Sequence, residues 1–330
     1  MAPHRLALIG AGTVGGSFLE ALGSRAGDAG IDLVLLSDSD SVAIDRDGLE
    51  PETVLERKRR TGRVGSKMAA LDALATTDVD ILVDASPTTL GDAEPGFSYQ
   101  SAAIDQGAHV VTANKGPVAL RYGELTERAD AAGVSIKLNA TVGGGVPIIP
   151  VLEEVLEAND VLGVRGVLNG TCNFILTRME SEGLAYEHVL GEAQDMGVAE
   201  EDPSFDVDGI DTALKCAILA NVIYGIDATL DDVDVTGITD ITPKSLRLAE
   251  ESGQVVRLVG EVTYDRLQVA PRLLPAGDVL DVAGTLNAVT IDADRSGALT
   301  LTGYGAGGPE TASALIGDII DLVRTDRETG

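Results

Sequence analysis

A glycine-rich turn between an apolar strand and a helix constrains the fold of this chain more than any other feature. Residues 6–9 have strand length, a helical pattern starts at residue 14, and Gly10, Gly12 and Gly15 stand in GxGxxG spacing. The first glycine permits a tight turn, the second lets a pyrophosphate approach the backbone, and the third lets helix and strand pack closely. Another α/β protein could use such a turn, but this context favours dinucleotide binding.

The first half of the chain alternates strand and helix patterns. Apolar strands are expected at residues 31–36, 79–85, 109–112 and 134–138, and helices at residues 99–106 and 118–132. This alternation predicts a Rossmann-type parallel sheet, which binds ligands at the carboxyl ends of its strands. Ser86 and Lys115 each follow one of these strands, so both are expected at that edge. Residues 45–63 are expected to form an excursion from the sheet.

The second strand and the excursion bear on cofactor choice. Asp38 lies 23 residues after Gly15, about where an acid can bind a ribose 2′-hydroxyl, which favours NAD. The basic run at residues 57–60, which includes Lys58, is either a solvated helix face or a cluster for the 2′-phosphate of NADP. We expect the protein to use both cofactors.

A second domain begins near three consecutive glycines at residues 143–145. With Pro147 close behind, these glycines indicate a backbone-lined ligand loop or a flexible linker. Alternating patterns predict antiparallel strands at residues 255–262, 267–273 and 289–301, in addition to a strand at residues 161–168. This is an α+β domain whose sheet could pair across a dimer.

Three segments follow from these patterns. They are a dinucleotide-binding domain at residues 1–138, a substrate-binding and dimerisation domain at residues 139–302, and a C-terminal loop and helix at residues 303–330 that return to the first domain.

The stretch from residue 200 to residue 215 carries the strongest candidate for chemistry. An acidic loop leads into an apolar helix at residues 210–223, in which Asp211 opens the first turn and Lys215 lies four residues later on the same face. The simplest interpretation is an exposed ion pair. The helix is too apolar to be mostly exposed, however, and only six of the 24 basic residues are lysines. Lys215 is therefore a candidate catalytic residue.

Composition excludes several classes of protein. The net charge of −29 and a pI near 4.2 argue against nucleic-acid binding. No apolar run of 18 residues predicts a membrane span, and the N-terminus does not resemble a secretory leader. Cys172 and Cys216 fit free thiols better than a disulfide framework, so we expect a cytoplasmic location.

The acidity itself indicates a salty environment. Carboxylates are spread along the chain, lysine is scarce and tryptophan is absent, as in proteins of halophiles that accumulate salt. Self-repulsion destabilises such a chain in dilute buffer, whereas at about 1 M salt the Debye length falls to about 3 Å. A merely acidic cytosolic enzyme would not explain the scarcity of lysine.

Seven motifs in order give the chain a specific resemblance. They are Gly10-x-Gly12-x-x-Gly15, Val-Thr-Ala-Asn-Lys-Gly-Pro at 111–117, Ala-Thr-Val-Gly-Gly-Gly-Val-Pro at 140–147, Leu-Asn-Gly-Thr-x-Asn-Phe-Ile-Leu at 168–176, Gly-x-Ala-Glu-x-Asp-Pro at 197–203, Asp206-x-x-Gly209-x-Asp211-x-x-x-Lys215, and Gly-Ala-Gly-x-Pro-x-Thr-Ala at 305–312. In these motifs the chain resembles homoserine dehydrogenase over essentially its whole length. The resemblance is to the short monofunctional type, without an aspartate kinase region or a regulatory domain.

The resemblance implies an activity and residue roles. The family interconverts L-homoserine and L-aspartate 4-semialdehyde with NAD or NADP, on the route to threonine and methionine. Lys215 is implied as the proton donor or acceptor and Lys115 as a residue at the junction of nicotinamide and substrate. The implied substrate-binding residues are Glu200, Asp206 and Asp211, and the implied cofactor contacts beyond the glycines of the turn are Thr13, Val14, Ser86, Gly197 and Gly305.

One departure from the family concerns a monovalent cation. The family usually has a glutamate where this chain has Asn139, and that glutamate joins backbone carbonyls, here those of Val142, Gly144 and Val146. Because an amide oxygen is neutral, we expect a weak or empty cation site. The alternative is that Asn139 caps a turn and no ion binds.

Two other functions share part of this pattern. One is a two-domain dehydrogenase of another small amino acid or dicarboxylate, which would keep the glycine turn without the acidic stretch. The other is a non-catalytic nucleotide sensor. Retention of both Lys115 and Lys215 argues against a sensor, because binding alone needs no proton donor.

Overall fold

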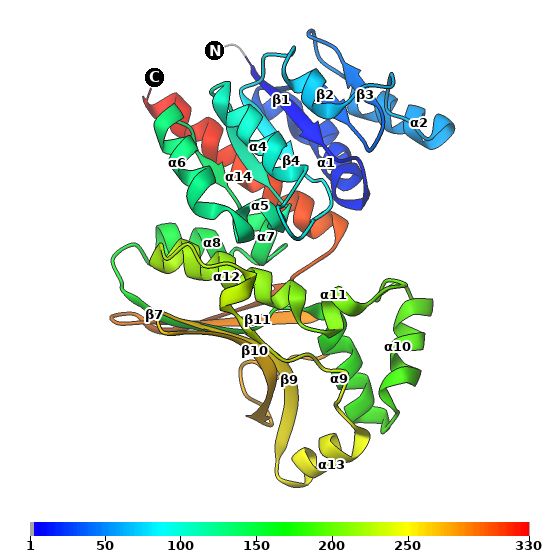
Figure 1. The fold of residues 1–330 in the computed structure, drawn as a ribbon, viewed down its shortest axis with the longest axis vertical. Helices are drawn as coiled ribbons and strands as arrows, with labels where there is room; N and C mark the ends of the chain where they lie inside the picture. The colour runs from blue at the N-terminus through cyan, green and yellow to red at the C-terminus, as the bar shows by residue number, and fades with distance from the viewer. Residues whose placement is uncertain (1–2, 330) are drawn as a thin grey trace. The chain divides into compact units, whose positions relative to one another are not determined.

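The computed structural model describes residues 3–329, without the side chains of residues 23–29, 326, 328 and 329. The chain forms two compact units (Figure 1). Unit 1 comprises residues 1–145 and 306–330, and unit 2 comprises residues 146–305. The sequence analysis placed these changes after residues 138 and 302. Residues 139–145 stay with unit 1 because helix α7 (Asn139–Val142) packs against helix α14 (Gly308–Thr329).

Unit 1 is a Rossmann-type unit, as the alternating patterns predicted. Its sheet has the order β3-β2-β1-β4-β5-β6, and all neighbours are parallel except β3, which pairs antiparallel to β2. The strands are β1 (His4–Ile9), β2 (Ile31–Ser37), β3 (Val42–Ile44), β4 (Ile81–Asp84), β5 (His109–Thr112) and β6 (Ile136–Lys137). The order reverses between β1 and β4, and such switch points are where parallel sheets bind ligands.

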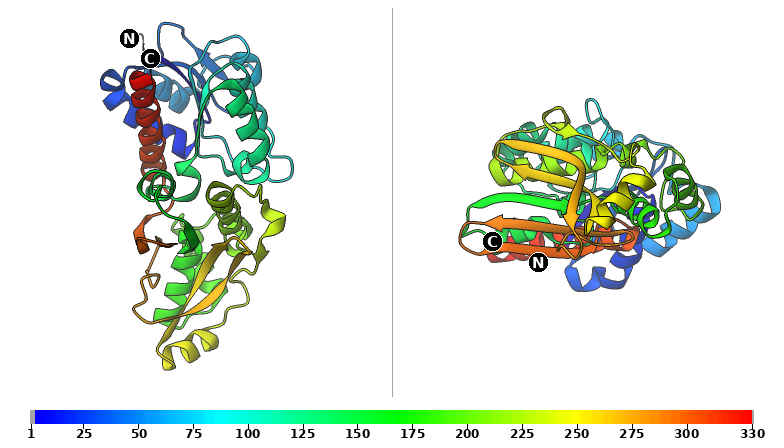
Figure 2. Two further views of the ribbon diagram at one scale, coloured as in Figure 1. Left: turned by 90° about the vertical axis from the view of Figure 1, so that its left-hand side faces the viewer. Right: turned by 90° about the horizontal axis from the view of Figure 1, so that it is seen from below.

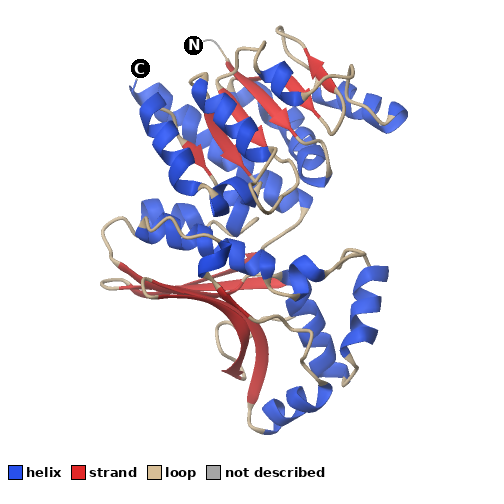
Figure 3. Ribbon diagram, in the orientation of Figure 1, coloured by secondary structure: helices blue, strands red, loops and turns tan. Residues whose placement is uncertain are grey.

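Helices flank this sheet (Figure 3). They are α1 (Thr13–Ala29), α2 (Pro51–Thr61), α3 (Ala70–Leu74), α4 (Gly96–Asp105), α5 (Lys115–Leu120), α6 (Tyr122–Ala132), α7 and α14. Helix α14 lies alongside α1 (Figure 2). The core of unit 1 joins Phe18 and Leu19 of α1 to Leu315 and Leu322 of α14, all at most 3% exposed.

Two expectations for unit 1 were wrong in detail. The helix expected at residues 118–132 is two helices, α5 and α6, because the backbone at Arg121 is not helical (φ −143°, ψ 37°). The strand expected at residues 134–138 is only the two-residue β6. The excursion at residues 45–63 contains α2, and the short β3 before it was not predicted.

Unit 2 is an α+β unit with a sheet of order β12-β11-β7-β9-β10-β8. The strands are β7 (Val161–Val167), β8 (Asp234–Val235), β9 (Gln254–Thr263), β10 (Arg266–Pro275), β11 (Leu286–Ala293) and β12 (Gly297–Tyr304). The single strand expected at residues 289–301 is instead part of the hairpin β11–β12. The apolar residues of both strands, such as Val289, Ile291, Leu299 and Leu301, all fall on odd positions. The polar residues 294–296 and Gly297, whose φ is 75°, mark where the chain reverses.

Unit 2 also contains helices and short helical turns. They are α8 (Ile148–Pro150) with a π-helical turn (Val151–Val155), α9 (Gly170–Glu182), α10 (Tyr186–Asp195), α11 (Ser204–Val207), α12 (Ile210–Tyr224), a 3₁₀ turn (Leu230–Asp232) and α13 (Pro243–Glu251). Helix α12 packs on β9 and β10, and every residue from Asp211 to Asn221 is buried. In the described part of the chain, no helix is long and apolar enough to cross a membrane.

Candidate active site

Lys215 lies in the middle of the buried helix α12 and is only 5% exposed. Its ammonium group donates hydrogen bonds to Oδ2 of Asp211 and to the carbonyl oxygen of Leu168, both at 2.7 Å. The interpretation of Asp211 and Lys215 as an exposed ion pair is therefore wrong, since both side chains are less than 10% exposed. A buried ion pair with further hydrogen bonds is held in a defined geometry.

The start of α12 depends on a glycine. Gly209 has a φ of 89°, and a Cβ there would lie 3.0 Å from the Val235 side chain. A residue with a side chain would be strained in this conformation and would contact its neighbour closely. Gly209 thus lets the chain turn from α11 directly into α12 and places Asp211 in the first helical turn.

Asn169 connects two carboxylates of this site. Its Nδ2 donates to Oδ1 of Asp206 at 2.7 Å and to Oδ2 of Asp211 at 3.0 Å. Its Oδ1 accepts from the Cys172 N–H and so caps α9. The sequence analysis quoted Asn169 within a motif but gave it no role. An Asn-Gly-Thr step before a helix is a capping signal, which is how the residue could have been found.

The carboxylates outnumber the lysine in this cluster. Burial and the charge of Asp211 raise the pKa of Asp206, and Lys215 opposes the shift only weakly. Burial also raises the pKa of the Cys172 thiol well above its usual range, which favours the thiol over the reactive thiolate. A partly buried site with two acids and one lysine favours a ligand that brings a positive charge of its own, such as an ammonium group.

Glu200 and Gly197 lie in the loop between α10 and α11. Gln194 holds this loop by donating to the carbonyl oxygen of Glu200 at 3.1 Å, and the Glu200 side chain is exposed. Gly197 has a φ of 71°. Gly305 is at the end of unit 2, where a Cβ would lie 1.8 Å from Nδ2 of Asn287. The cofactor roles of these two glycines rest on the resemblance alone.

In unit 1 the glycine turn has the geometry expected of a dinucleotide-binding turn. Gly10 has a φ of 98°, and a Cβ there would lie 2.3 Å from the carbonyl oxygen of Ala85. A Cβ at Gly15 would lie 1.9 Å from the carbonyl oxygen of Gly10, whereas one at Gly12 would meet nothing within 4 Å. Thr13 and Val14 open α1, so the helix N-terminus faces the open side of the turn, which suits a pyrophosphate.

Asp38 and Lys58 are both engaged within unit 1. Oδ1 of Asp38 accepts from the N–H and the hydroxyl of Ser41 at 2.8 and 2.7 Å, and Oδ2 accepts from the Val64 N–H at 3.3 Å. Lys58, on α2, donates to the carbonyl oxygen of Ala11 inside the glycine turn. The solvated-face interpretation fits the exposed Arg59, which pairs with Glu20, but it does not fit Lys58.

The two loops that carry Ser86 and Lys115 adjoin each other. Lys115 is the first residue of α5, and its N–H donates to Oγ1 of Thr88 at 3.2 Å. Asn114 caps α5 by accepting from the Gly116 N–H, and its Nδ2 donates to the Ser86 hydroxyl at 3.0 Å. Ser86 and Lys115 thus lie at the carboxyl edge of the sheet, as the sequence analysis predicted.

Asn139 does not cap a turn. It is the first residue of α7, its side chain makes no capping bond, and its Oδ1 has no hydrogen-bond partner among residues 3–329. Its N–H donates to the Asp318 carboxylate of α14 at 3.3 Å. Gly143 and Gly144 are buried, whereas Gly145 is exposed and is the last residue of unit 1 before the chain enters unit 2. No cluster of three or more His, Cys, Asp or Glu that could hold a metal occurs among the described residues.

Comparison with known proteins covers both units. The family described as homoserine dehydrogenase matches residues 147–320, and its NAD-binding domain matches residues 10–139. A homoserine dehydrogenase of Methanocaldococcus jannaschii is 41% identical over 302 residues, which are 90% of each chain.

Solved structures agree with these matches. A protein of Archaeoglobus fulgidus is 38% identical with a TM-score of 0.91, over 97% of this chain and 99% of that one. A hyperthermophilic archaeal homoserine dehydrogenase in complex with NADPH is 30% identical with a TM-score of 0.87, over 98% of each chain. The chain therefore belongs to the homoserine dehydrogenase family, the NAD(P)-dependent oxidoreductases that interconvert L-homoserine and L-aspartate 4-semialdehyde.

Proposed function

We propose that Lys215 exchanges the proton of the reacting oxygen in this reaction. The observation that carries the proposal is the buried ammonium group of Lys215, held by Asp211 and by the carbonyl oxygen of Leu168. The nicotinamide, when bound, supplies or accepts the hydride. An aldehyde that gains hydride becomes an alkoxide, and a positioned ammonium group can both stabilise that charge and donate a proton.

Lys115, in unit 1, and three acids of unit 2 have further proposed roles. Lys115 supplies a positive charge beside the nicotinamide and the substrate. The carboxylates of Asp206, Asp211 and Glu200 hold the substrate's ammonium and hydroxyl end, which fits the excess of negative charge around Asn169. The cofactor is held by the glycine turn and the start of α1 in unit 1.

Reduction of L-aspartate 4-semialdehyde by NADPH or NADH in molar KCl tests the activity. We expect turnover with both cofactors and loss of turnover in Lys215→Ala, with Lys244→Ala as the matched control because Lys244 is an exposed lysine of the same unit. Higher kcat/KM with another small amino or dicarboxylic aldehyde would favour the alternative dehydrogenase. Cofactor binding without turnover would favour the sensor.

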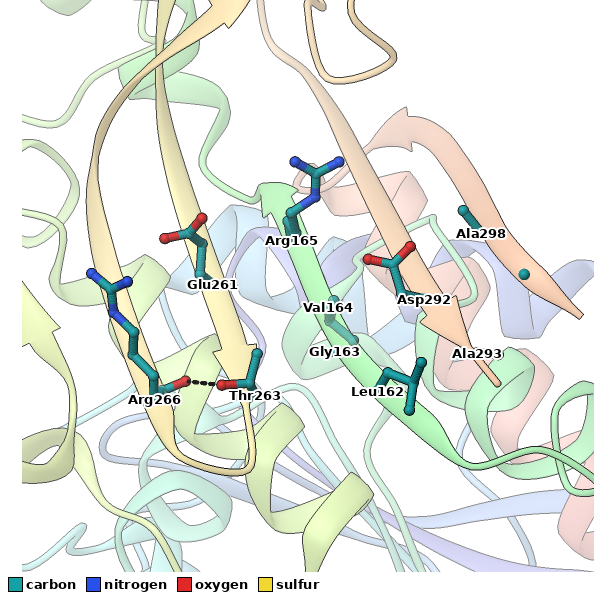
Figure 4. Close-up of a pocket in the computed structure, with 11 residues that line it drawn as sticks. Leu162, Gly163, Val164, Arg165, Glu261, Thr263, Arg266, Asp292, Ala293 and Ala298 are labelled. Atoms are coloured by element: carbon teal, nitrogen blue, oxygen red, sulfur yellow. Dashed lines mark hydrogen bonds between the residues drawn. The ribbon is translucent and has the colours of Figure 1, made fainter. Parts of the chain in front are cut away.

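We further propose a homodimer that buries one face of the unit 2 sheet. A hollow of about 500 Å³ lies over β7, β9, β11 and β12, and Figure 4 shows Arg165, Glu261, Arg266 and Asp292 around it. Leu162, at its rim, is 60% exposed. Two copies of a face with both signs of charge can complement each other across a two-fold axis. Light scattering in molar KCl should give a mass twice that of one chain. Leu162→Lys should lower this mass towards that of a single chain, whereas Leu248→Lys, on α13, should leave it unchanged.

The setting of the enzyme is also proposed. It would act in the cytoplasm of a salt-accumulating organism, on the route to threonine and methionine. The net charge of −29 supports the salt requirement. Dilution into buffer without salt or ligand should inactivate the enzyme, and full activity after hours under those conditions would contradict this proposal.

A further inference from the structure

Asp84 is a fully buried carboxylate at the end of β4, the strand next to the switch point of the unit 1 sheet. Its Oδ1 accepts from the N–H and the hydroxyl of Ser86 at 3.0 and 2.6 Å. Its Oδ2 accepts from Nε2 of Gln100 at 2.8 Å and from Nδ2 of Asn114 at 3.3 Å. These four donors are neutral, so the carboxylate is held by hydrogen bonds and not by an ion pair.

Three of these four donors belong to Ser86 and Asn114, in the loops of the proposed site. Ser86 is the second residue after β4, and Asn114 precedes Lys115 at the start of α5. Asn114 has both ends of its amide committed, because Nδ2 faces Asp84 and Ser86 while Oδ1 accepts from the Gly116 N–H at 3.1 Å. Any shift of Asp84 would therefore be passed to the Ser86 loop and to the backbone around Lys115.

Close packing leaves these loops little freedom. A Cβ at Gly96 would lie 2.3 Å from Nδ2 of Asn114, and one at Gly116 would lie 2.6 Å from the carbonyl oxygen of Thr89. Helix α4 and the Thr89 backbone thus hold the start of α5 from two sides. On the other side, the loop after β4 approaches Gly10 of the glycine turn as closely as a glycine allows.

Burying this carboxylate and its partners lowers the stability of the folded protein. Burial is the largest influence on Asp84 and raises its pKa, even though all four donors favour the ionised form. Gln100 points its amino group at Asp84, and its Oε1, in a side chain that is fully buried, has no hydrogen-bond partner in the described structure. Such a buried acceptor costs free energy. A network with these costs suits a role in function better than a role in stability.

We propose that Asp84 is a positioning residue that fixes the Ser86 loop and the start of α5, and thereby sets where Lys115 stands. Being fully buried, it does not itself touch the ligands. This inference rests on the proposed roles of Ser86 and Lys115 in the dehydrogenase reaction.

Asp84→Asn is the test, because it keeps the shape and replaces one carboxylate oxygen by an amino group that faces donors. The amide of Gln100 can turn to present its free Oε1. Asn114 cannot turn without releasing the Gly116 N–H. We expect kcat to fall by up to about 100-fold, since small misplacements of reacting groups have effects of that size, and the KM for cofactor to rise. Ser101→Ala is the matched control, since Ser101 is buried on the same helix as Gln100 and its hydroxyl has no partner among the described residues.

A merely structural role would lower the melting temperature of Asp84→Asn while kcat per folded molecule and KM stay as in Ser101→Ala. That outcome would overturn the proposal. If Asp84→Asn does not fold, Gln100→Leu removes one donor to Asp84 together with the hydrogen bond from the same Nε2 to Oγ1 of Thr112, and a smaller fall in kcat with raised KM is expected. Unchanged kcat and KM in Gln100→Leu would then count against the proposal.

A double variant separates failure of this inference from failure of the proposed site. If Asp84 acts through Lys115, Asp84→Asn combined with Lys115→Ala should be no slower than Lys115→Ala alone. Losses that multiply would show that Asp84 does not act through Lys115. If Lys115→Ala is fully active, the proposed role of Lys115 is wrong. The effect of Asp84 on cofactor binding through the Ser86 loop is then tested by measuring NADPH affinity by fluorescence. An unchanged affinity in Asp84→Asn would exclude that effect as well.

Discussion

The buried carboxylates of the two units have different kinds of hydrogen-bond partner. In unit 1 one buried carboxylate, Asp84, receives only neutral donors, and all of them except Gln100 of α4 belong to loops. In unit 2 two carboxylates, Asp206 and Asp211, share one amide donor, and Asp211 also binds the ammonium group of Lys215. The hydrogen bonds of Asp84 hold the backbone of the loops that donate them. The cluster in unit 2 keeps several dissociable protons close together, as a reaction at a substrate oxygen requires. Changes in unit 2 should therefore alter the chemical step and its pH dependence.

The largest effect is expected at Lys215. Lys215→Ala removes the proposed proton donor and should lower kcat by about 10²–10⁴-fold, the usual range for a positioned acid or base. Lys115→Ala should also cost orders of magnitude. The variants should remain folded by circular dichroism in molar KCl, and the exposed Lys244→Ala should be unaffected. Turnover near that of the wild type in Lys215→Ala would show that the unit 2 cluster is not built for proton transfer.

Asp206 should affect the stability of unit 2 as well as substrate binding. In the folded protein the pKa of Asp206 is raised above 3.8, so the folded state favours the protonated carboxyl more than the unfolded state does. The stability that this preference contributes is present at low pH and is lost as pH rises through the raised pKa. Asp206→Asn should therefore melt higher than the wild type at pH 7 and lose this advantage at about pH 4. It should also bind substrate more weakly, since one carboxylate for the ammonium group is gone.

Asp202 is the control with the opposite sign. The Ser204 hydroxyl and N–H lower its pKa, so its ionised form is favoured in the folded protein. Asp202→Asn should melt no higher than the wild type at pH 7. Equal behaviour of the two variants would mean that burial next to Asp211 is not what distinguishes Asp206.

A smaller effect is expected at Lys58, the proposed contact of unit 1 with the 2′-phosphate of NADP. Lys58 binds a neutral carbonyl oxygen of the glycine turn, a partner that a 2′-phosphate could replace. Lys58→Ala should lower the ratio of kcat/KM for NADP to that for NAD by about tenfold, the worth of one charge-assisted hydrogen bond. The neighbouring Arg59→Ala should leave the ratio unchanged. The same ratio in both variants would exclude Lys58 from phosphate recognition.

The sequence predicted what depends on local pattern and missed what depends on contact across the fold. Glycine spacing and apolar periodicity gave the Rossmann-type unit, and the helix that pairs Asp211 with Lys215 followed from four-residue spacing. Asp84 was missed because two of its three partner residues are 16 and 30 residues away and meet it only when β4, α4 and α5 come together. The β11–β12 hairpin was missed because both of its strands share one alternating pattern.

The last prediction concerns Asn139, a neutral side chain in unit 1 whose Oδ1 has no partner among residues 3–329. Any monovalent cation held here by backbone oxygens, chiefly those of Val142 and Gly144 in the same unit, would lack a charged ligand. Molar salt can fill such a weak site by mass action.

The wild-type enzyme should therefore respond to salt through screening, with little difference between Na⁺ and K⁺ at equal ionic strength. Asn139→Glu adds a charge in a largely buried position, where it attracts an ion more strongly than it would in water. This variant should show saturable activation by millimolar cation on top of the screening effect. Asn139→Gln is the matched control, because it lengthens the side chain equally without a charge and should show no saturation. A tight and selective site in the wild type, found by cation titration, would mean that the backbone oxygens alone suffice and that the missing charge is unimportant.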